Sequence, residues 1–90
     1  MPVVIAWHVV EVRPISNSRL VVTFADGTHG DVDLSRLISR ADAGVFETLR
    51  DPVAFSRVGI VHGAVSWPNG VELAPDATYD DIKATGRSMP

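Results

Sequence analysis

The chain has 90 residues, of which 46% are hydrophobic and 21% charged, with a formal net charge of -3 and no cysteine. This length suits one compact domain, and the composition is that of an ordinary globular protein. The lack of cysteine excludes disulfides and thiolate metal sites and favours a reducing, cytoplasmic location. The negative charge argues against nucleic acid as the main partner, and no apolar run is long enough to cross a membrane.

The first expected strand covers residues 5–13, which are apolar and rich in β-branched side chains. This apolar start lacks the basic region of a signal peptide, so a strand is the better interpretation. Residues 14–18 have turn chemistry and are expected to end the strand.

The two runs on either side of Asp26 and Gly27 are expected to form a hairpin. A three-residue turn over residues 25–27 sets Leu20 opposite Val32 and keeps the apolar side chains on one face. A two-residue turn would set apolar side chains opposite polar ones. The favoured turn ends with Gly27 in the left-handed region.

A second three-residue turn is expected at Pro68, Asn69 and Gly70. It places Trp67 opposite Val71, whereas a two-residue Asn-Gly turn would set Trp67 opposite a glutamate. Proline suits the first corner of a type I turn, and Gly70 is then left-handed.

A two-residue turn at His62 and Gly63 is expected to join two further short strands. With this turn, Ile60 pairs with Val65, and three short strands agree on one apolar face. The side chains of that expected face are Val58, Ile60, Val65, Trp67, Val71 and Leu73.

Helical periodicity appears between the two β regions, with apolar residues at i, i+3, i+4 and i+7 over residues 34–41. Asp33 or Ser35 can cap the start of this helix and Gly44 can end it. Asp51 followed by Pro52 is typical of a further helix start.

A last helix is expected between Asp76, as its cap, and Gly86, as its stop. The element order is therefore β-β-β-α-β-β-β-α, an α+β fold in which helices pack on antiparallel sheet. We expect a single domain over residues 1–85 and a flexible tail over residues 86–90.

Four segments of the chain resemble the bacterial domain-of-unknown-function family 2442. They are "LVVTFADG", "DL", the spaced "F..L.DP..F..V", and "VSWPNGVEL.PD..Y", which together run from about Val9 to Tyr79. Departures are Glu72, where the family often has Asp, and residues 77–79, where a Leu often precedes the Tyr. The resemblance implies a small α+β domain without established enzymatic activity. Its members look as if they occur alone, beside another small uncharacterised protein, or fused to a helix-turn-helix, which suggests a regulatory or toxin–antitoxin-like role.

Alternate residues His29, Asp31 and Asp33 share one face of an expected strand and could present ligands to a divalent metal or a small molecule. The competing interpretation is a solvated face, with Asp33 paired to Arg19 or capping the following helix. Three ligands from one strand rarely converge without a fourth from elsewhere.

Other candidate chemistry is weaker. No spacing between a serine and His8 or His62 indicates a catalytic nucleophile with its base. The sequence also contains no phosphate-binding loop. Arg36, Arg40 and Arg57, with Arg50 between them, could contact nucleic acid, but such a stripe is more often a solvated helix face.

Trp67, Asp76 and Tyr79 form the best candidate interaction surface, because Trp and Tyr are enriched at interfaces. The register argument nevertheless points Trp67 into the apolar face. The sequence favours a non-enzymatic interaction or regulatory module without a cofactor. Its expected partner is another protein or a second copy, reached through exposed sheet edges.

Overall fold

The computed structural model describes residues 5–16, 18–39 and 44–90. The first half contains strands β1 (Val9–Ser16), β2 (Arg19–Phe24) and β3 (His29–Asp33), helix α1 (Ser35–Ser39), the 3-10 helix η1 (Gly44–Arg50) and helix α2 (Pro52–Ser56). The second half contains strands β4 (Gly59–Val61) and β5 (Ala64–Ser66), helix α3 (Pro75–Thr85) and strand β6 (Arg87–Ser88). The α+β fold class is confirmed.

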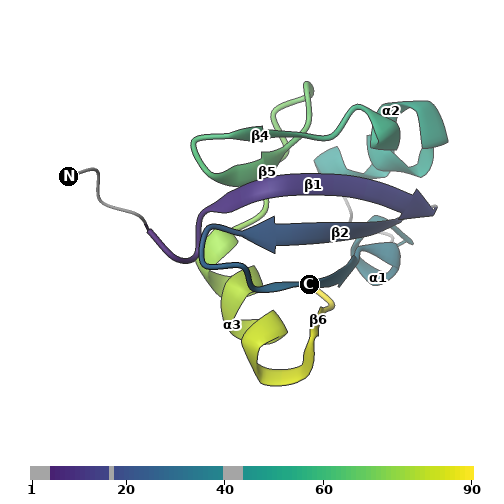
Figure 1. Cartoon of the computed structure of the whole chain (residues 1–90). Helices are drawn as coiled ribbons and strands as arrows, with labels where there is room; N and C mark the ends of the chain where they lie inside the picture. The colour runs from purple at the N-terminus through teal and green to yellow at the C-terminus, as the bar shows by residue number, and fades with distance from the viewer. Residues whose placement is uncertain (1–4, 17, 40–43) are drawn as a thin grey trace.

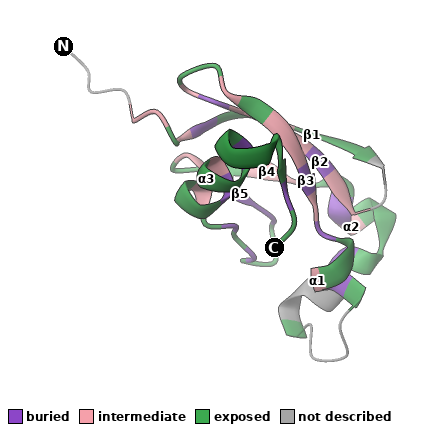
Figure 2. Ribbon diagram, turned by 90° about the horizontal axis from the view of Figure 1, so that it is seen from below, coloured by how far each residue is buried: buried purple, intermediate pink, exposed green. Residues whose placement is uncertain are grey.

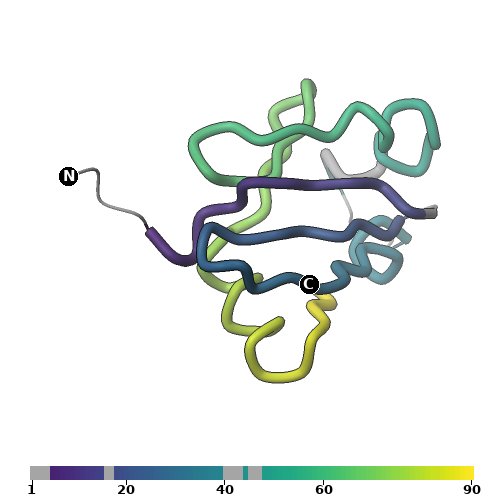
Figure 3. The backbone as a smooth tube through the Cα atoms, viewed as in Figure 1, coloured from purple at the N-terminus to yellow at the C-terminus, as the bar shows by residue number. Residues whose placement is uncertain are grey.

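Two sheets make up the β structure. The larger has the order β1-β2-β3-β6, antiparallel except for the parallel pair of β3 and β6, and the smaller is the β4–β5 hairpin. The β4–β5 hairpin lies alongside β1, while the chain returns after α3 to place β6 next to β3 (Figure 1). The sheet edge at β3 is therefore occupied by the C-terminal segment (Figure 3).

The expected register of the β2–β3 hairpin is confirmed. Leu20 pairs with Val32, and the Phe24 N–H donates to the Thr28 carbonyl over 2.7 Å. Gly27 has a φ of 90°, as the three-residue turn requires. Even-numbered residues of β2 are buried and odd-numbered ones are half-buried, so one face meets the core.

The prediction for the first strand was wrong at both ends. Residues 5–8 lie outside β1, and β1 continues through Pro14 to Ser16. Pro14 pairs with Leu20. The Phe24 N–H donates to Thr28 on the β3 side, so the N–H of Leu20, four residues earlier in β2, also points to β3, and Leu20 and Pro14 form a pair without hydrogen bonds between them. The missing N–H of Pro14 therefore points to the outer edge of the sheet, where no ladder bond is lost.

The Pro68–Gly70 turn also has the expected register. The Trp67 N–H donates to the Val71 carbonyl over 2.9 Å, and Gly70 has a φ of 91°. The third expected strand is present only as an isolated bridge between Ser66 and Glu72.

The His62–Gly63 turn pairs Ile60 with Val65 as expected, with positive φ at both turn residues. The shared apolar face is nevertheless incomplete. Val65 is buried, whereas Ile60 is 37% exposed.

Local capping explains two of the helix starts. The Asp33 carboxylate accepts a hydrogen bond from the Ser35 N–H over 2.9 Å at the start of α1, and Asp51 accepts from the Val53 N–H over 3.0 Å at the start of α2. The expected end of the first helix, including Ala41, falls on residues 40–43 and lies outside the described residues.

The start of α3 differs from the prediction. Ala74 is its N-cap residue and makes no side-chain cap, Pro75 occupies the first turn, and Asp76 lies inside the helix. Proline starts the helix without a capping carboxylate because its fixed φ is already helical and its missing N–H needs no partner there. Gly86 ends the helix with a φ of 80°, as expected.

The expected tail over residues 86–90 needs correction at Arg87 and Ser88. These residues form β6, and the Ser88 hydroxyl, in a residue only 1% exposed, donates to Asp81 Oδ2 over 2.9 Å. Pairing with β3 and this bond to α3 hold the segment against the domain.

The core lies between the larger sheet, α3 and the β4–β5 hairpin, where buried positions of all three face each other (Figure 2). Its buried apolar members are Val9, Leu20, Val22, Phe24, Val32, Leu34, Ile38, Leu49, Phe55, Val65, Trp67, Val71, Leu73 and Ile82. Within the described part of the chain, no helix is long and apolar enough to span a membrane.

Candidate functional site

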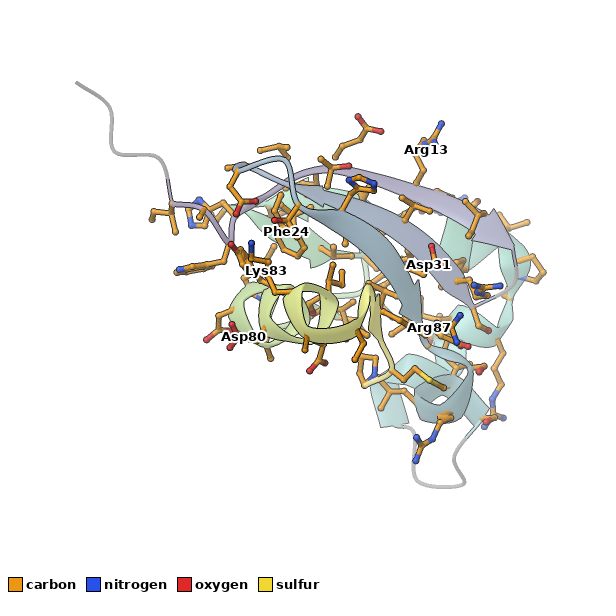
Figure 4. All side chains as sticks on the ribbon, turned by 60° about the horizontal axis from the view of Figure 1, so that its bottom comes forward. Arg13, Phe24, Asp31, Asp80, Lys83 and Arg87 are labelled. Atoms are coloured by element: carbon orange, nitrogen blue, oxygen red, sulfur yellow. The ribbon has the colours of Figure 1, made fainter. Side chains whose placement is uncertain are left out.

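The tip of the β2–β3 hairpin is bonded to helix α3. The Tyr79 hydroxyl donates to Asp26 Oδ2 over 2.5 Å, and the Tyr79 ring lies 5.1 Å from the ring of Phe24 between centroids. Lys83, one turn further along α3, has its amine 5.8 Å from the Tyr79 ring centroid. Figure 4 shows Phe24 and Lys83 on the side of the sheet that α3 covers, with Arg13 on the opposite side.

This contact shifts the acidity of both partners. The Tyr79 hydroxyl, followed by the backbone N–H and the hydroxyl of Thr28, lowers the pKa of Asp26 from 3.8 to about 2. The same bond raises the pKa of Tyr79, because the carboxylate accepts the phenolic proton. Asp26 therefore stays ionised and Tyr79 protonated at neutral pH, an arrangement suited to holding structure rather than moving protons.

The three candidate metal ligands lie at alternate positions of β3 but are engaged separately. Asp31 Oδ2 accepts from Arg19 over 2.9 Å, and Asp33 binds the Ser35 N–H. The Ser35 hydroxyl and N–H lower the pKa of Asp33. His29 is exposed, with Nδ1 at 3.3 Å from the Gly27 carbonyl oxygen.

Within residues 5–16, 18–39 and 44–90, no group of three His, Cys, Asp or Glu side chains is placed to hold a metal ion. The expected ion pair of Arg19 with Asp33 is replaced by an ion pair with Asp31. Arg19 stands opposite Asp33 in the ladder, yet its guanidinium binds Asp31 on the diagonal.

Among the described residues, the arginines considered as nucleic-acid contacts lie at two different pockets. Arg36 lines a shallow cavity of about 370 Å³ on α1 together with Arg50, whose Nε donates to the Ile38 carbonyl over 2.9 Å. Arg57 lies instead at a second pocket beside Trp67. Arg40 falls outside the described residues.

The three residues of the candidate interaction surface are divided between the core and helix α3. Trp67 is 4% exposed and its indole N–H donates to the Phe55 carbonyl over 2.9 Å, so its ring belongs to the core. Tyr79 is half-buried against the hairpin tip, and Asp76 is exposed in the first turn of α3. The expected position of Trp67 in the apolar face is therefore confirmed, which removes it from the candidate interaction surface.

A different set of apolar side chains is exposed where β1 meets β4. The Val9 N–H donates to the Gly63 carbonyl over 2.8 Å, which joins β1 to the β4–β5 hairpin. Within three residues of this bond lie four large apolar side chains that are 37% to 58% exposed. We call them the β1–β4 surface: Trp7, Val10, Ile60 and Val61.

Two histidines flank the β1–β4 surface. The His8 ring packs edge-on against Trp7 with centroids 4.9 Å apart, and it covers Gly63, where an added Cβ would lie 2.6 Å from the ring. His62 is exposed in the turn with a φ of 51°. Glycine at position 63 thus permits the close approach of the two chain segments.

Sequence reasoning missed the β1–β4 surface. Val9 and Val10 are equally apolar neighbours, so the sequence contains no polar alternation to show which one faces outward. Ile60 and Val61 are likewise both apolar, so the sequence does not show that both are exposed. The contact of β1 with β4, which decides their exposure, joins segments far apart in the chain.

Comparison with known protein families gives one match. A family model described as "Protein of unknown function (DUF2442)" matches residues 9–84, most of the chain. The chain belongs to the DUF2442 family. No curated protein and no solved structure matches it.

The DUF2442 segments that carry the resemblance come together in the fold. The hairpin motif with Phe24 and Asp26 meets Tyr79 of the last motif through the bond and ring contact described above. The Trp-Pro-Asn-Gly motif forms its own turn against the core. These motif residues therefore define how DUF2442 folds in this chain.

Proposed function

We propose that this domain acts by binding another protein rather than by catalysis. The single observation that carries the proposal is the β1–β4 surface. Isolated exposed apolar residues are ordinary, whereas several gathered at one place mark contact sites on small proteins. Here Trp7, Val10, Ile60 and Val61 lie within three residues of one backbone hydrogen bond, with Ile60 and Val61 on opposite faces of β4.

The titratable groups support the same proposal. The shifted pKa values belong to Asp26, Asp33 and Tyr79, and each shift comes from a hydrogen bond that holds a turn or a helix start in place. For a carboxyl or phenol group to act as a general acid or base near neutral pH, its pKa would have to shift toward neutrality, in a cleft with room for a substrate. These three groups are instead at the hairpin tip and at the start of α1.

Strand addition is not the favoured mode of contact. The outer edge of β1 carries Pro14, which offers no N–H, and the edge at β3 is taken by β6. Side-chain packing on the β1–β4 surface is therefore the proposed route to a partner.

The proposed partner is a small protein encoded beside this one, with the domain acting as an antitoxin-like or regulatory subunit. The family resemblance suggests this arrangement. The lack of cysteine fits a reducing compartment, so we place the proposed complex in the cytoplasm. A second copy of the chain is the alternative occupant of the surface.

Co-expression tests the proposal. The tagged chain is produced with the product of the adjacent gene, and the complex is measured by co-purification and by size-exclusion chromatography with light scattering. The test variant is Val10→Glu/Val61→Glu, which places charges in the β1–β4 surface. The matched control is Val53→Glu, at an apolar residue that is 60% exposed on α2.

We expect the native chain and Val53→Glu to form the complex, or a homodimer, and the double variant to remain a folded monomer. Charge placed in a packed interface is strongly unfavourable because it is desolvated without a partner. Equal assembly by all three proteins, or a monomeric native chain that ignores the adjacent gene product, would reject the proposal.

A further inference from the structure

A small pocket opens beside the turn that follows β5. Three segments distant in sequence form its walls: η1, the end of α2, and the turn itself. Its volume is about 140 Å³. Cofactor and metabolite sites usually span about 300–1,000 Å³, so this pocket is too small for them. It has room for about four to five waters of about 30 Å³ each, which suits one leucine-sized side chain.

Two of the residues that line the pocket are apolar and fixed in position. They are Leu49 and Trp67, and both are almost fully buried. The Trp67 indole N–H donates to the Phe55 carbonyl over 2.9 Å, and the two rings pack with centroids 5.8 Å apart. Because the polar end of the indole is already bonded, the ring offers the pocket an apolar surface that needs no rearrangement on binding.

The rim carries a cation. Arg57 lines the pocket and is exposed. Across the described ranges, its guanidinium has neither a hydrogen bond nor an ion pair. A guanidinium presents a planar set of donors that matches a carboxylate in two parallel hydrogen bonds. The pocket therefore combines space for one aliphatic side chain with a charge that attracts an acid beside it.

We propose that this pocket binds a peptide segment of a partner protein in which an aliphatic side chain stands next to an acidic residue. The aliphatic side chain packs on Trp67 and Leu49, and the neighbouring carboxylate binds Arg57. The proposal rests on the protein-binding function for the existence of a partner. It adds a second contact that uses none of the residues of the β1–β4 surface.

The test uses the isolated chain and a defined probe. The chain has two tryptophans, so its indole N–H region in a ¹H–¹⁵N NMR spectrum holds two signals, which Trp7→Phe assigns. The probe is the capped peptide acetyl-Asp-Leu-Asp-amide. We expect it to shift the Trp67 indole signal in a saturable way and to leave the Trp7 signal in place.

Three comparisons separate the parts of the proposed contact. Arg57→Gln should raise the dissociation constant of the probe by about tenfold, the size expected for the loss of a charge-assisted hydrogen bond. Arg36→Gln is the matched control, an exposed arginine on α1 that does not line this pocket, and it should bind as the native chain does. The peptides acetyl-Asn-Leu-Asn-amide and acetyl-Asp-Ala-Asp-amide should each bind more weakly than the probe.

Several results would overturn the proposal. They are an unshifted Trp67 signal, equal binding by Arg57→Gln, or equal binding of the uncharged peptide. A stronger response to a thymidine octamer than to the probe would assign Arg57 to nucleic acid instead. Since the titration does not involve the β1–β4 surface, its failure leaves the co-expression result unchanged, and the reverse also holds.

Discussion

Tyr79 and Asp26, which lie 53 residues apart in the sequence, share a hydrogen bond that fastens helix α3 to the tip of the β2–β3 hairpin. The bond is reinforced by the contact of the Tyr79 and Phe24 rings. Because the hairpin carries the inner strands of the larger sheet, this contact sets where α3 lies over the core.

The Tyr79–Asp26 bond predicts a specific pH dependence. It is the largest of the contributions, ahead of the Thr28 N–H and hydroxyl, that lower the folded-state pKa of Asp26 from 3.8 to about 2. The stabilisation is therefore fully present above pH 3.8 and is lost as the pH falls through about 2. Tyr79 has the opposite shift, so on its side the stabilisation is present below pH 10.0 and is lost as the pH rises through its raised pKa.

The variant Tyr79→Phe isolates this effect, because it keeps the ring contact with Phe24 and the bond from the Thr28 N–H to Asp26. We expect the native chain to be more stable than the variant at pH 6, with the difference shrinking between pH 4 and pH 2. Urea unfolding followed by circular dichroism at pH 6, 4, 3 and 2 measures this. A difference that stays constant over that range contradicts the prediction.

The left-handed glycines at the two three-residue turns give a second prediction. An added Cβ at Gly27 or Gly70 meets no atom within 4 Å, so alanine there costs only backbone strain. We expect Gly27→Ala and Gly70→Ala each to lower the free energy of unfolding by about 1–2 kcal/mol. Gly59→Ala is the control, since Gly59 has equally open space and no positive φ.

Gly59→Ala should change the stability by no more than about 0.5 kcal/mol or raise it slightly. Urea unfolding of the three variants at neutral pH makes the comparison. If Gly27→Ala is no less stable than Gly59→Ala, the turn geometry on which the register depends is wrong.

The parts of the fold that sequence predicted well are those where two constraints agree. At Gly27 and Gly70, the turn chemistry and the segregation of apolar side chains both select the same register. Asp51 followed by Pro52 is likewise a local signal that needs no distant partner.

The parts that sequence missed depend on distant contacts. The pairing of Arg87 with Asp31 makes a strand from a segment whose composition is typical of a tail. Pro14 breaks a strand in most settings but is accommodated at an edge, and the edge is known only once the sheet is assembled. The sequence indicated Asp26 as a turn residue and Tyr79 as a surface residue. Their hydrogen bond was not predicted, because it depends on where α3 packs against the hairpin.

Metal binding on β3 gives a third prediction. Asp31 and Asp33 already bind Arg19 and the Ser35 N–H, so a divalent ion at His29 would have to displace both contacts. A site filled at about a hundred times its dissociation constant would raise the melting temperature by roughly 10 °C or more in a domain this small. We expect no such rise with Mg²⁺, Mn²⁺, Ni²⁺ or Zn²⁺, measured by thermal shift. A rise that His29→Ala abolishes would contradict this and would revive the metal-binding alternative.

Gly30 gives the last prediction, because it lets α3 and β6 approach the sheet. An added Cβ at Gly30 would lie 2.5 Å from the Gly86 carbonyl oxygen and 2.8 Å from Ile82 Cγ2. The first of these is a backbone atom that cannot rotate away, so the end of α3 must move. Gly30→Ala should lower the free energy of unfolding by about 1–3 kcal/mol, the usual cost of overpacking.

Amide hydrogen exchange distinguishes this displacement from general weakening. The Asp31 N–H donates to the Gly86 carbonyl over 3.3 Å, so its exchange should accelerate in Gly30→Ala. The Phe24 N–H, bonded to Thr28 within the hairpin, should be less affected because the hairpin itself need not move. Equal acceleration at both amides would mean that the substitution weakens the whole sheet. A stability no lower than that of Gly59→Ala would mean that α3 and β6 can shift at little cost, and β6 would then be a loosely held strand.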